Sequence, residues 1–182
     1  LENHSACDDL VMFKVFESAQ EQDEWVAAEI QKNIQQDELR RDDIIVINPN
    51  PLTTRKRVAP IRNLLYEKGI SSHVSGVDTS PDIFFTNESV VFTGIYRAKG
   101  NEAAMVYVIN AQDCYTSEKE NEIAAVRNRL FTAITRSKAW VRVLGFGSGM
   151  EKLMQEFEEV KKHNFKLDFI YPTQEERKRM NI

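Results

Sequence analysis

The chain has few cysteines and histidines and no excess of positive charge. Its 182 residues include two Cys and three His, and the formal net charge at pH 7 is -4. Cys7 and Cys114 lack CxxC spacing, so a disulfide framework and a zinc centre are both poor interpretations, and no metal site is expected. The acidic balance argues against a basic protein that coats nucleic acid by bulk electrostatics.

Long apolar runs are also missing. The longest, 103–109, is far shorter than the roughly 20 residues that a bilayer-spanning helix needs, and the N-terminus does not look like a secretion signal. We therefore expect a cytoplasmic protein with no membrane partner. The chain begins with Leu1 rather than Met, from which we expect a longer polypeptide with a further N-terminal portion.

The phosphate-binding loop G-x-x-x-x-G-K-[ST] is absent as well. Gly94 and Gly100 have the spacing of its two glycines, but Asn101 follows where the lysine is required. The stretch 145–149 offers three alternating glycines between a predicted strand and a predicted helix, yet Met150 stands where a dinucleotide-binding turn needs its last glycine. A tight strand-to-helix turn is the better interpretation.

Short apolar runs alternate with longer amphipathic stretches along the chain. The runs that predict strands are 11–16, 44–47, 70–74, 90–93, 105–110, 140–144 and 167–170. Capping-box spacings predict helix starts at Ser18, Ser148 and Thr173, and a further helix is predicted over 53–68. This alternation is typical of an α/β fold with a mostly parallel sheet flanked by helices.

We expect one domain over 1–171, since a hydrophobic content of 42% is enough for a core. Within it, the polar, turn-rich stretch 76–88 predicts a short linker. The charged residues 172–182 predict a C-terminal helix or tail.

The stretch 90–109 predicts two strands joined by a loop from Tyr96 to Glu102. The loop offers a flexible backbone position at Gly100 and two cations, Arg97 and Lys99. Together with the Glu102 carboxylate, this set suits a polyanion that carries a sugar. Amides and cations bind phosphate, and a carboxylate accepts hydrogen bonds from ribose hydroxyls. Composition alone leaves open a second interpretation, a solvated charged turn.

A helix is predicted from Glu122 to Lys138, followed by a strand at Trp140. Its sheet-facing side would hold Leu130, Ala133 and Ile134, extended by Phe131. The stretch 127–142 contains cations and no acid: Arg127, Arg129, Arg136, Lys138 and Arg142. Arg136 would lie in the last helical turn, where interaction with the helix dipole, worth about 0.3 to 1 kcal/mol, is a sufficient structural explanation.

Together the two segments resemble the last two motifs of a UvrD/Rep-type superfamily 1A helicase. Tyr-Arg-Ala-Lys-Gly-Asn-Glu is similar to motif V, and Arg-Asn-Arg-Leu-Phe-Thr-Ala-Ile-Thr-Arg-Ser-Lys is similar to motif VI. Their order, their spacing and the strand after each motif all match. The resemblance covers 44–144 and implies the C-terminal, second RecA-like motor lobe, a three-layer fold.

The resemblance implies an ATP site shared with an N-terminal lobe that carries the P-loop and the Mg²⁺ ligands. Arg136 would be the arginine finger on the γ-phosphate, a contact worth about 10³ to 10⁵ in rate. Glu102 would bind the ribose, with Gly100 and Lys99 beside the phosphates. The intact protein would be an ATP-hydrolysing helicase or translocase, and this fragment alone is expected to be inactive.

The same resemblance implies contact with single-stranded nucleic acid, DNA in preference to RNA. Tyr96 stands where the family usually has a strand-contacting His, and Arg97 follows it. Gly94 replaces a usual Thr, whose role Thr93 would take. Arg55 begins a helix, where the dipole disfavours cations, so with Asn50 it would meet a phosphate backbone; surface solubility is the alternative. The large accessory domain that interrupts this lobe in related helicases is reduced here to 76–88.

Two other functional classes remain open on sequence grounds. One is a non-catalytic nucleic-acid-binding module with a degenerate helicase fold. The other is a protein-interaction domain whose Arg-rich helix docks an acidic partner.

Overall fold

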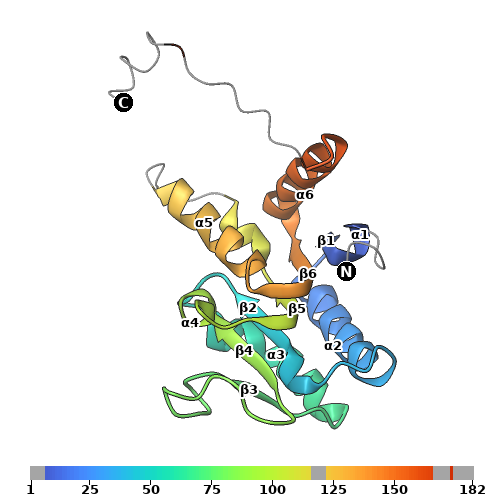
Figure 1. Cartoon of the computed structure of the whole chain (residues 1–182), viewed down its shortest axis with the longest axis vertical. Helices are drawn as coiled ribbons and strands as arrows, with labels where there is room; N and C mark the ends of the chain where they lie inside the picture. Colours follow the sequence, from blue (N-terminus) through green and yellow to red (C-terminus); the bar gives the residue numbers. More distant parts are fainter. Residues whose placement is uncertain (1–6, 116–121, 166–172, 174–182) are drawn as a thin grey trace.

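The computed structural model describes residues 7–115, 122–165 and 173. Its strands form one sheet with the order β1-β6-β5-β2-β4-β3, and every neighbouring pair is parallel (Figure 1). The strands are β1 (Val11–Phe16), β2 (Ile44–Asn48), β3 (Ser72–Val74), β4 (Val90–Gly94), β5 (Ala103–Val108) and β6 (Ser137–Phe146). Each overlaps a predicted strand, so the α/β prediction is confirmed. The expected strand at 167–170 and helix start at Thr173 concern a stretch that, apart from residue 173, lies outside the described residues.

Helices cover both faces of the sheet, which gives three layers (Figure 1). The helical elements are α1 (Cys7–Leu10), α2 (Ala19–Gln35), η1 (Arg41–Asp43), α3 (Thr54–Glu67), α4 (Ile95–Ala98), η2 (Ala111–Cys114), α5 (Ile123–Ile134) and α6 (Gly147–Lys162). Within the described part of the chain, no helix is both long and apolar enough to span a bilayer.

Two separate hydrophobic cores lie on either side of the sheet. On β2, Ile44 and Val46 join the core under α2 and α3, whereas Ile45 and Ile47 join the core under α4, α5 and α6. Successive side chains of a strand point to opposite faces, so a strand covered on both sides is apolar throughout. This explains why β2 reads as a continuous apolar run instead of an alternating one.

Because all described strands are parallel, their carboxyl ends share one edge of the sheet and their amino ends share the other. We call these the carboxyl edge and the amino edge. The chain leaves β2 toward β3 and β4, but leaves the neighbouring β5 in the opposite direction, toward β6. Such a reversal at the carboxyl edge marks the crevice where open α/β sheets bind ligands.

One predicted capping box is confirmed and another is wrong. Ser18 caps α2 and accepts from the Glu21 backbone N–H at 3.2 Å. Ser148 does not cap α6, which begins at Gly147 after Phe146. The Phe146 N–H donates instead to Gln112 Oε1 at 3.3 Å. A side chain distant in sequence therefore binds the N–H before the helix, the group that the N3 carboxylate binds in a capping box.

The helix predicted over 122–138 is shorter than expected, since α5 ends at Ile134. Strand β6 already begins at Ser137, which pairs with Ala103 of β5, so sheet pairing competes with further helix. Arg136 consequently lies in the turn between the two elements. The predicted sheet-facing side of the helix is confirmed for Leu130, Ala133 and Ile134, which join the core. The prediction that Phe131 extends this side is wrong, because Phe131 is 68% exposed.

Segment 76–88 is a series of turns beside β3. Asp78 Oδ2 accepts from the Val74 N–H at 2.8 Å and pairs with Arg62 at 2.8 Å. Buried His73 joins the Phe84 carbonyl at 2.9 Å and Ser89 Oγ at 2.8 Å. These contacts hold the segment against the sheet at several points.

Candidate nucleotide and nucleic-acid sites

Arg136 and Glu102 lie next to each other at the amino edge. Glu102 directly precedes β5 and Arg136 directly precedes β6, two strands that pair from Ala103 opposite Ser137. The Ala103 N–H donates to the Arg136 carbonyl at 3.1 Å. The pairing of β5 with β6 therefore brings Glu102, the predicted ribose contact, next to Arg136, the predicted arginine finger.

The Arg136 side chain folds back on the end of α5. Its Nε donates to the Thr132 carbonyl at 3.1 Å and its Nη2 donates to Thr135 Oγ1 at 3.2 Å. The first bond satisfies a carbonyl in the last helical turn, which is the structural role weighed for this residue. A guanidinium has five N–H donors, and these two bonds engage two of them.

Lys99, Gly100 and Glu102 form an open turn on the same side of the sheet. Gly100 has φ +88, a left-handed conformation that strains other residues, although a Cβ there would meet nothing within 4 Å. Lys99 and Glu102 are exposed. An exposed cation and carboxylate near a guanidinium fit the phosphates and sugar hydroxyls of a nucleotide.

Three of the predicted nucleic-acid residues line one hollow at the carboxyl edge. We call it the Arg55 cleft, a space of about 320 Å³. Arg55 comes from the first turn of α3, and Tyr96 and Arg97 come from α4. The complete lining is Pro51, Leu52, Thr54, Arg55, Val74, Ser75, Val77, Gly94, Tyr96 and Arg97. Tyr96 is 68% exposed and so presents its ring to solvent.

Thr93 and Asn50 do not line this cleft. Thr93 is fully buried and donates its hydroxyl to the Gly94 carbonyl at 3.3 Å. Asn50 shapes the turn before α3: its Oδ1 accepts from the Leu52 N–H at 3.1 Å, and its carbonyl accepts from Thr54 Oγ1 at 3.1 Å. Each residue adjoins one that lines the cleft, Gly94 after Thr93 and Pro51 after Asn50.

Tyr96 and Arg97 lie on the short helix α4, not in an extended loop as predicted. Arg97 Nε donates to Ser75 Oγ at 2.8 Å, and its Nη2 donates to the Pro81 carbonyl. A Cβ on Gly76 would come within 2.5 Å of the Arg97 guanidinium, so this contact requires glycine there. Arg97 therefore attaches segment 76–88 to α4.

The sequence interpretation missed Arg129, whose guanidinium carbon lies 6.0 Å from the centre of the Tyr96 ring. It missed as well a polar network at the carboxyl edge, where Asn110 Nδ2 donates to Asn48 Oδ1 at 3.0 Å and the Asn110 N–H donates to Gln22 Oε1 at 2.9 Å. The sequence shows that Arg129 stands seven residues before Arg136. It does not show that Arg129 faces Tyr96, because that contact depends on how α4 packs against α5.

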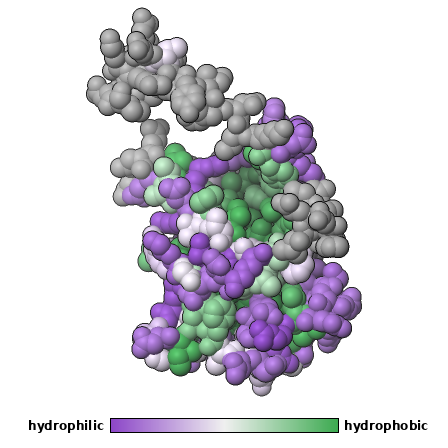
Figure 2. All heavy atoms as spheres, in the orientation of Figure 1, coloured by the Kyte–Doolittle hydropathy of each residue, from purple (hydrophilic) through white to green (hydrophobic). Residues whose placement is uncertain are grey.

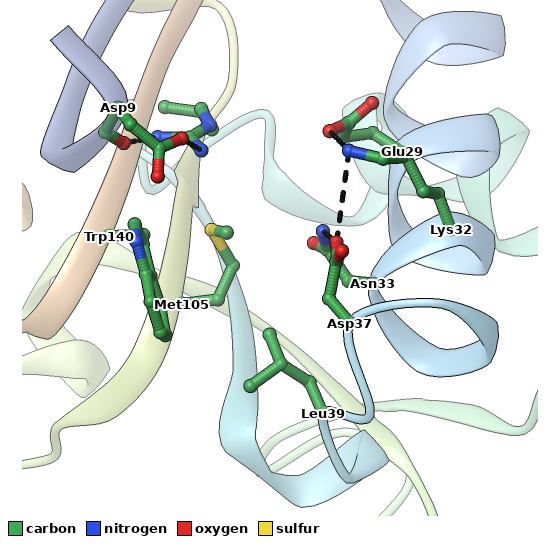
Figure 3. A pocket seen from close by; sticks show the side chains of 9 residues that line it. Asp9, Glu29, Lys32, Asn33, Asp37, Leu39, Met105 and Trp140 are labelled. Carbon is green, nitrogen blue, oxygen red and sulfur yellow. Dashed lines mark hydrogen bonds and ion pairs between the residues drawn. The ribbon is translucent and has the colours of Figure 1, made fainter. Parts of the chain in front are cut away.

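Two further hollows have a different chemistry. One, of about 460 Å³, lies against α2 and contains three carboxylates, from Asp9, Glu29 and Asp37 (Figure 3). Its two cations are already paired, Lys32 with Glu29 at 3.4 Å and buried Arg142 with Asp9 at 3.0 Å. A polyanion would be repelled by this lining.

The other hollow, of about 660 Å³, lies between α5 and α6 and is largely apolar (Figure 2). Phe131 and Phe157 are among its lining residues, and Arg127 at its rim pairs with Glu156. No group of three or more His, Cys, Asp or Glu side chains in the described ranges is arranged to hold a metal ion.

Comparison with known proteins agrees with the resemblance seen in the two motifs. The structure of the C-terminal domain of a possible DNA helicase from Lactobacillus plantarum WCFS1 is 20% identical, at a TM-score of 0.49, over 81% of this chain and 79% of that chain. Arterivirus nonstructural protein 10, a helicase solved with DNA, is 11% identical at a TM-score of 0.41, over 71% of this chain but only 27% of its own. No curated protein matches the sequence. The model of the UvrD-like helicase C-terminal domain matches residues 89–144, a range that contains both motif segments.

Proposed function

We propose that the chain is the C-terminal motor lobe of an ATP-dependent helicase or translocase. The observation that carries this proposal is the meeting of Glu102 and Arg136 at the amino edge, while Arg55 and Tyr96 gather at the opposite edge. One edge would complete a nucleotide site and the other would hold a nucleic acid strand. The nucleotide site would be shared with an N-terminal lobe that supplies the P-loop and the Mg²⁺ ligands.

At the nucleotide edge, each residue has a separate task. Arg136 would leave the Thr132 carbonyl and turn its guanidinium toward the γ-phosphate, where it would stabilise negative charge that develops during transfer. Glu102 would accept hydrogen bonds from the ribose, and Lys99 would lie beside the phosphates. ATP with Mg²⁺ supplies the reactive phosphoanhydride when it is bound. Without the other lobe, this chain would not hydrolyse ATP.

At the nucleic-acid edge, Arg55 would contact phosphates and the exposed Tyr96 ring would stack on a base. Buried Thr93 and half-buried Asn50 would act through the shape of the β4 end and of the turn before α3. Single-stranded DNA in preference to RNA and a cytoplasmic location are part of this proposal. Closure of the two lobes on ATP and opening after hydrolysis would move the strand across both lobes.

The test is Arg136→Ala in a polypeptide that contains this chain and the P-loop lobe. ATP turnover should fall by about 10³-fold or more, whereas ATP binding should be largely kept, because the finger acts on the transition state. Lys138→Ala, two residues away and exposed, is the matched control and should turn over normally. Wild-type turnover by the Arg136 variant would refute the finger assignment.

One observation favours a second candidate, a nucleic-acid-binding module that has lost the motor. The Arg136 guanidinium is engaged with Thr132 and Thr135 of its own helix end. In that case Arg136→Ala would lower stability and leave any ATP turnover of the longer polypeptide unchanged. The same experiment therefore separates the two candidates.

A further inference from the structure

A second hollow begins where the Arg55 cleft ends. We call it the α4–α5 groove, a space of about 340 Å³ lined by Ile95, Tyr96, Lys99, Ala125, Asn128, Arg129 and Thr132. Tyr96 lines both hollows, so its exposed ring stands at their junction. A ligand that leaves the cleft past Tyr96 enters the groove directly.

Arg129 approaches the Tyr96 ring from the groove side. Its guanidinium carbon is 6.0 Å from the ring centroid, and Arg129 lines the groove but not the cleft. A cation over an aromatic face at this distance is attracted by the ring quadrupole. Arg129 lies on the groove side of the ring, which leaves the cleft side for a stacked base.

Charge in the two hollows has a single sign. The charged residues that line the groove are Lys99 and Arg129, and those that line the cleft are Arg55 and Arg97; no carboxylate is among the described lining of either. The chain as a whole carries a net charge of -4. By contrast, the hollow against α2 contains three carboxylates (Figure 3). The local potential therefore favours a polyanion along the cleft and groove.

Cations that follow a backbone beside an aromatic platform are the features with which proteins hold single strands. We propose that the α4–α5 groove continues the path of the single strand beyond Tyr96, and that Arg129 binds a backbone phosphate there. A base stacks on Tyr96 from the cleft side, and the strand then passes Arg129 on the groove side of the ring. This inference rests on the proposed strand contact in the Arg55 cleft and adds a second binding segment, from the α5 helix.

The test measures binding of labelled oligothymidylates to the 182-residue chain by fluorescence anisotropy over a range of salt. A short oligonucleotide of about three nucleotides fits the cleft, and one of about eight reaches both hollows. Arg129→Gln should leave the short probe bound as before and weaken the long probe about three- to tenfold. The slope of log affinity against log salt should fall in magnitude by about 0.7, the value for one phosphate contact of a single strand.

Arg127→Gln is the matched control, two residues away on the same helix. Arg127 lines the apolar hollow and pairs with Glu156, so its variant should bind both probes like the wild type. Equal affinity of Arg129→Gln and wild type for the long probe, with unchanged melting temperatures, would overturn the inference. So would an equal loss in the two arginine variants.

Failure of the proposed cleft contact would look different. Arg55→Ala and Tyr96→Ala should weaken binding of the short probe, which occupies the cleft that both residues line. If they leave it unchanged while Arg129→Gln weakens the long probe, the cleft assignment fails and the groove stands. If Arg55→Ala and Tyr96→Ala weaken binding of the short probe while Arg129→Gln affects neither probe, the cleft contact is supported and the groove contact is refuted.

Discussion

Asp23 is the buried carboxylate with the clearest energetic consequence in the described chain. It lies in α2 at the carboxyl edge, where Gln22 Nε2 donates to its Oδ1 at 3.2 Å. Burial raises the pKa of Asp23 from 3.8 to about 6, and the Gln22 hydrogen bond and the charge of Arg57 only partly oppose this shift. Gln22 also accepts from the Asn110 backbone, so the carboxylate adjoins the network that fixes the ends of β2 and β5.

The raised pKa predicts how stability depends on pH. The folded state holds the Asp23 proton more tightly than the unfolded state does, so the favourable contribution is complete below about pH 4 and is lost as pH rises through 6. Asp23→Asn keeps the acceptor and removes the charge. It should raise the free energy of unfolding at pH 8 by about 1 to 3 kcal/mol, and by about half as much at pH 5.

Urea unfolding of the variant and the wild type at both pH values measures this difference. Glu24→Gln provides the control, since Glu24 is the next residue of α2 and is exposed. Its stability difference from wild type should not change between the two pH values. A gain for Asp23→Asn that is the same at pH 5 and pH 8 would contradict the assignment of the shift to Asp23.

At the scale of elements, Arg97 links α4 to segment 76–88 through Pro81 and through Ser75, the residue before the segment. Arg97→Ala removes both contacts and leaves the Ser75 hydroxyl, in a buried residue, without its partner. The segment should then open more often. Limited chymotrypsin digestion should cleave after Phe84 or Phe85 at least about threefold faster in the variant, because cleavage follows the population of the open form.

Arg55→Ala is the matched control for that digestion. Arg55 lines the same cleft but belongs to α3, so its loss removes a similar charge without releasing the segment. Equal cleavage rates in Arg97→Ala and wild type would show that Arg97 does not restrain the segment. Arg97 would then be available to bind a nucleic acid strand, as the sequence predicted.

How far the sequence predicted these elements depends on how local their causes are. Every described strand was found, because buried parallel strands are apolar runs between turn signals. Ser18 was found because its bond to Glu21 spans one helical turn. The start of α6 and the end of α5 were missed, because Gln112 and the pairing of Ala103 with Ser137 decide them from a distance.

The candidate site divides in the same way. Glu102, Arg136 and Tyr96 were chosen from motif order, and the structure places the first two at one edge and the third at the other. The complete burial of Thr93 could not be predicted from the sequence. A mainly apolar strand does not show which of its polar side chains the helices cover. The Arg129 contact with Tyr96 needed the packing of α4 on α5.

At the scale of the whole molecule, the sheet separates the two proposed sites. Strand β4 has five residues, so at about 3.3 Å per residue the carboxyl and amino edges lie roughly 16 Å apart along it. At physiological salt the Debye length is about 8 Å, so a charge at one edge is largely screened at the other. A substitution at one edge should therefore change the binding at that edge, nucleotide or nucleic acid, without changing the binding at the other.

In the chain without nucleotide at physiological salt, Glu102→Gln should leave the affinity for a short oligothymidylate unchanged. Tyr96→Ala should weaken it about tenfold, as expected for the loss of one base stack. Anisotropy titrations of both variants measure this, with melting temperatures to confirm folding. A comparable loss in Glu102→Gln would mean that the strand reaches the amino edge, and the division of the lobe into a nucleotide edge and a nucleic-acid edge would then be wrong.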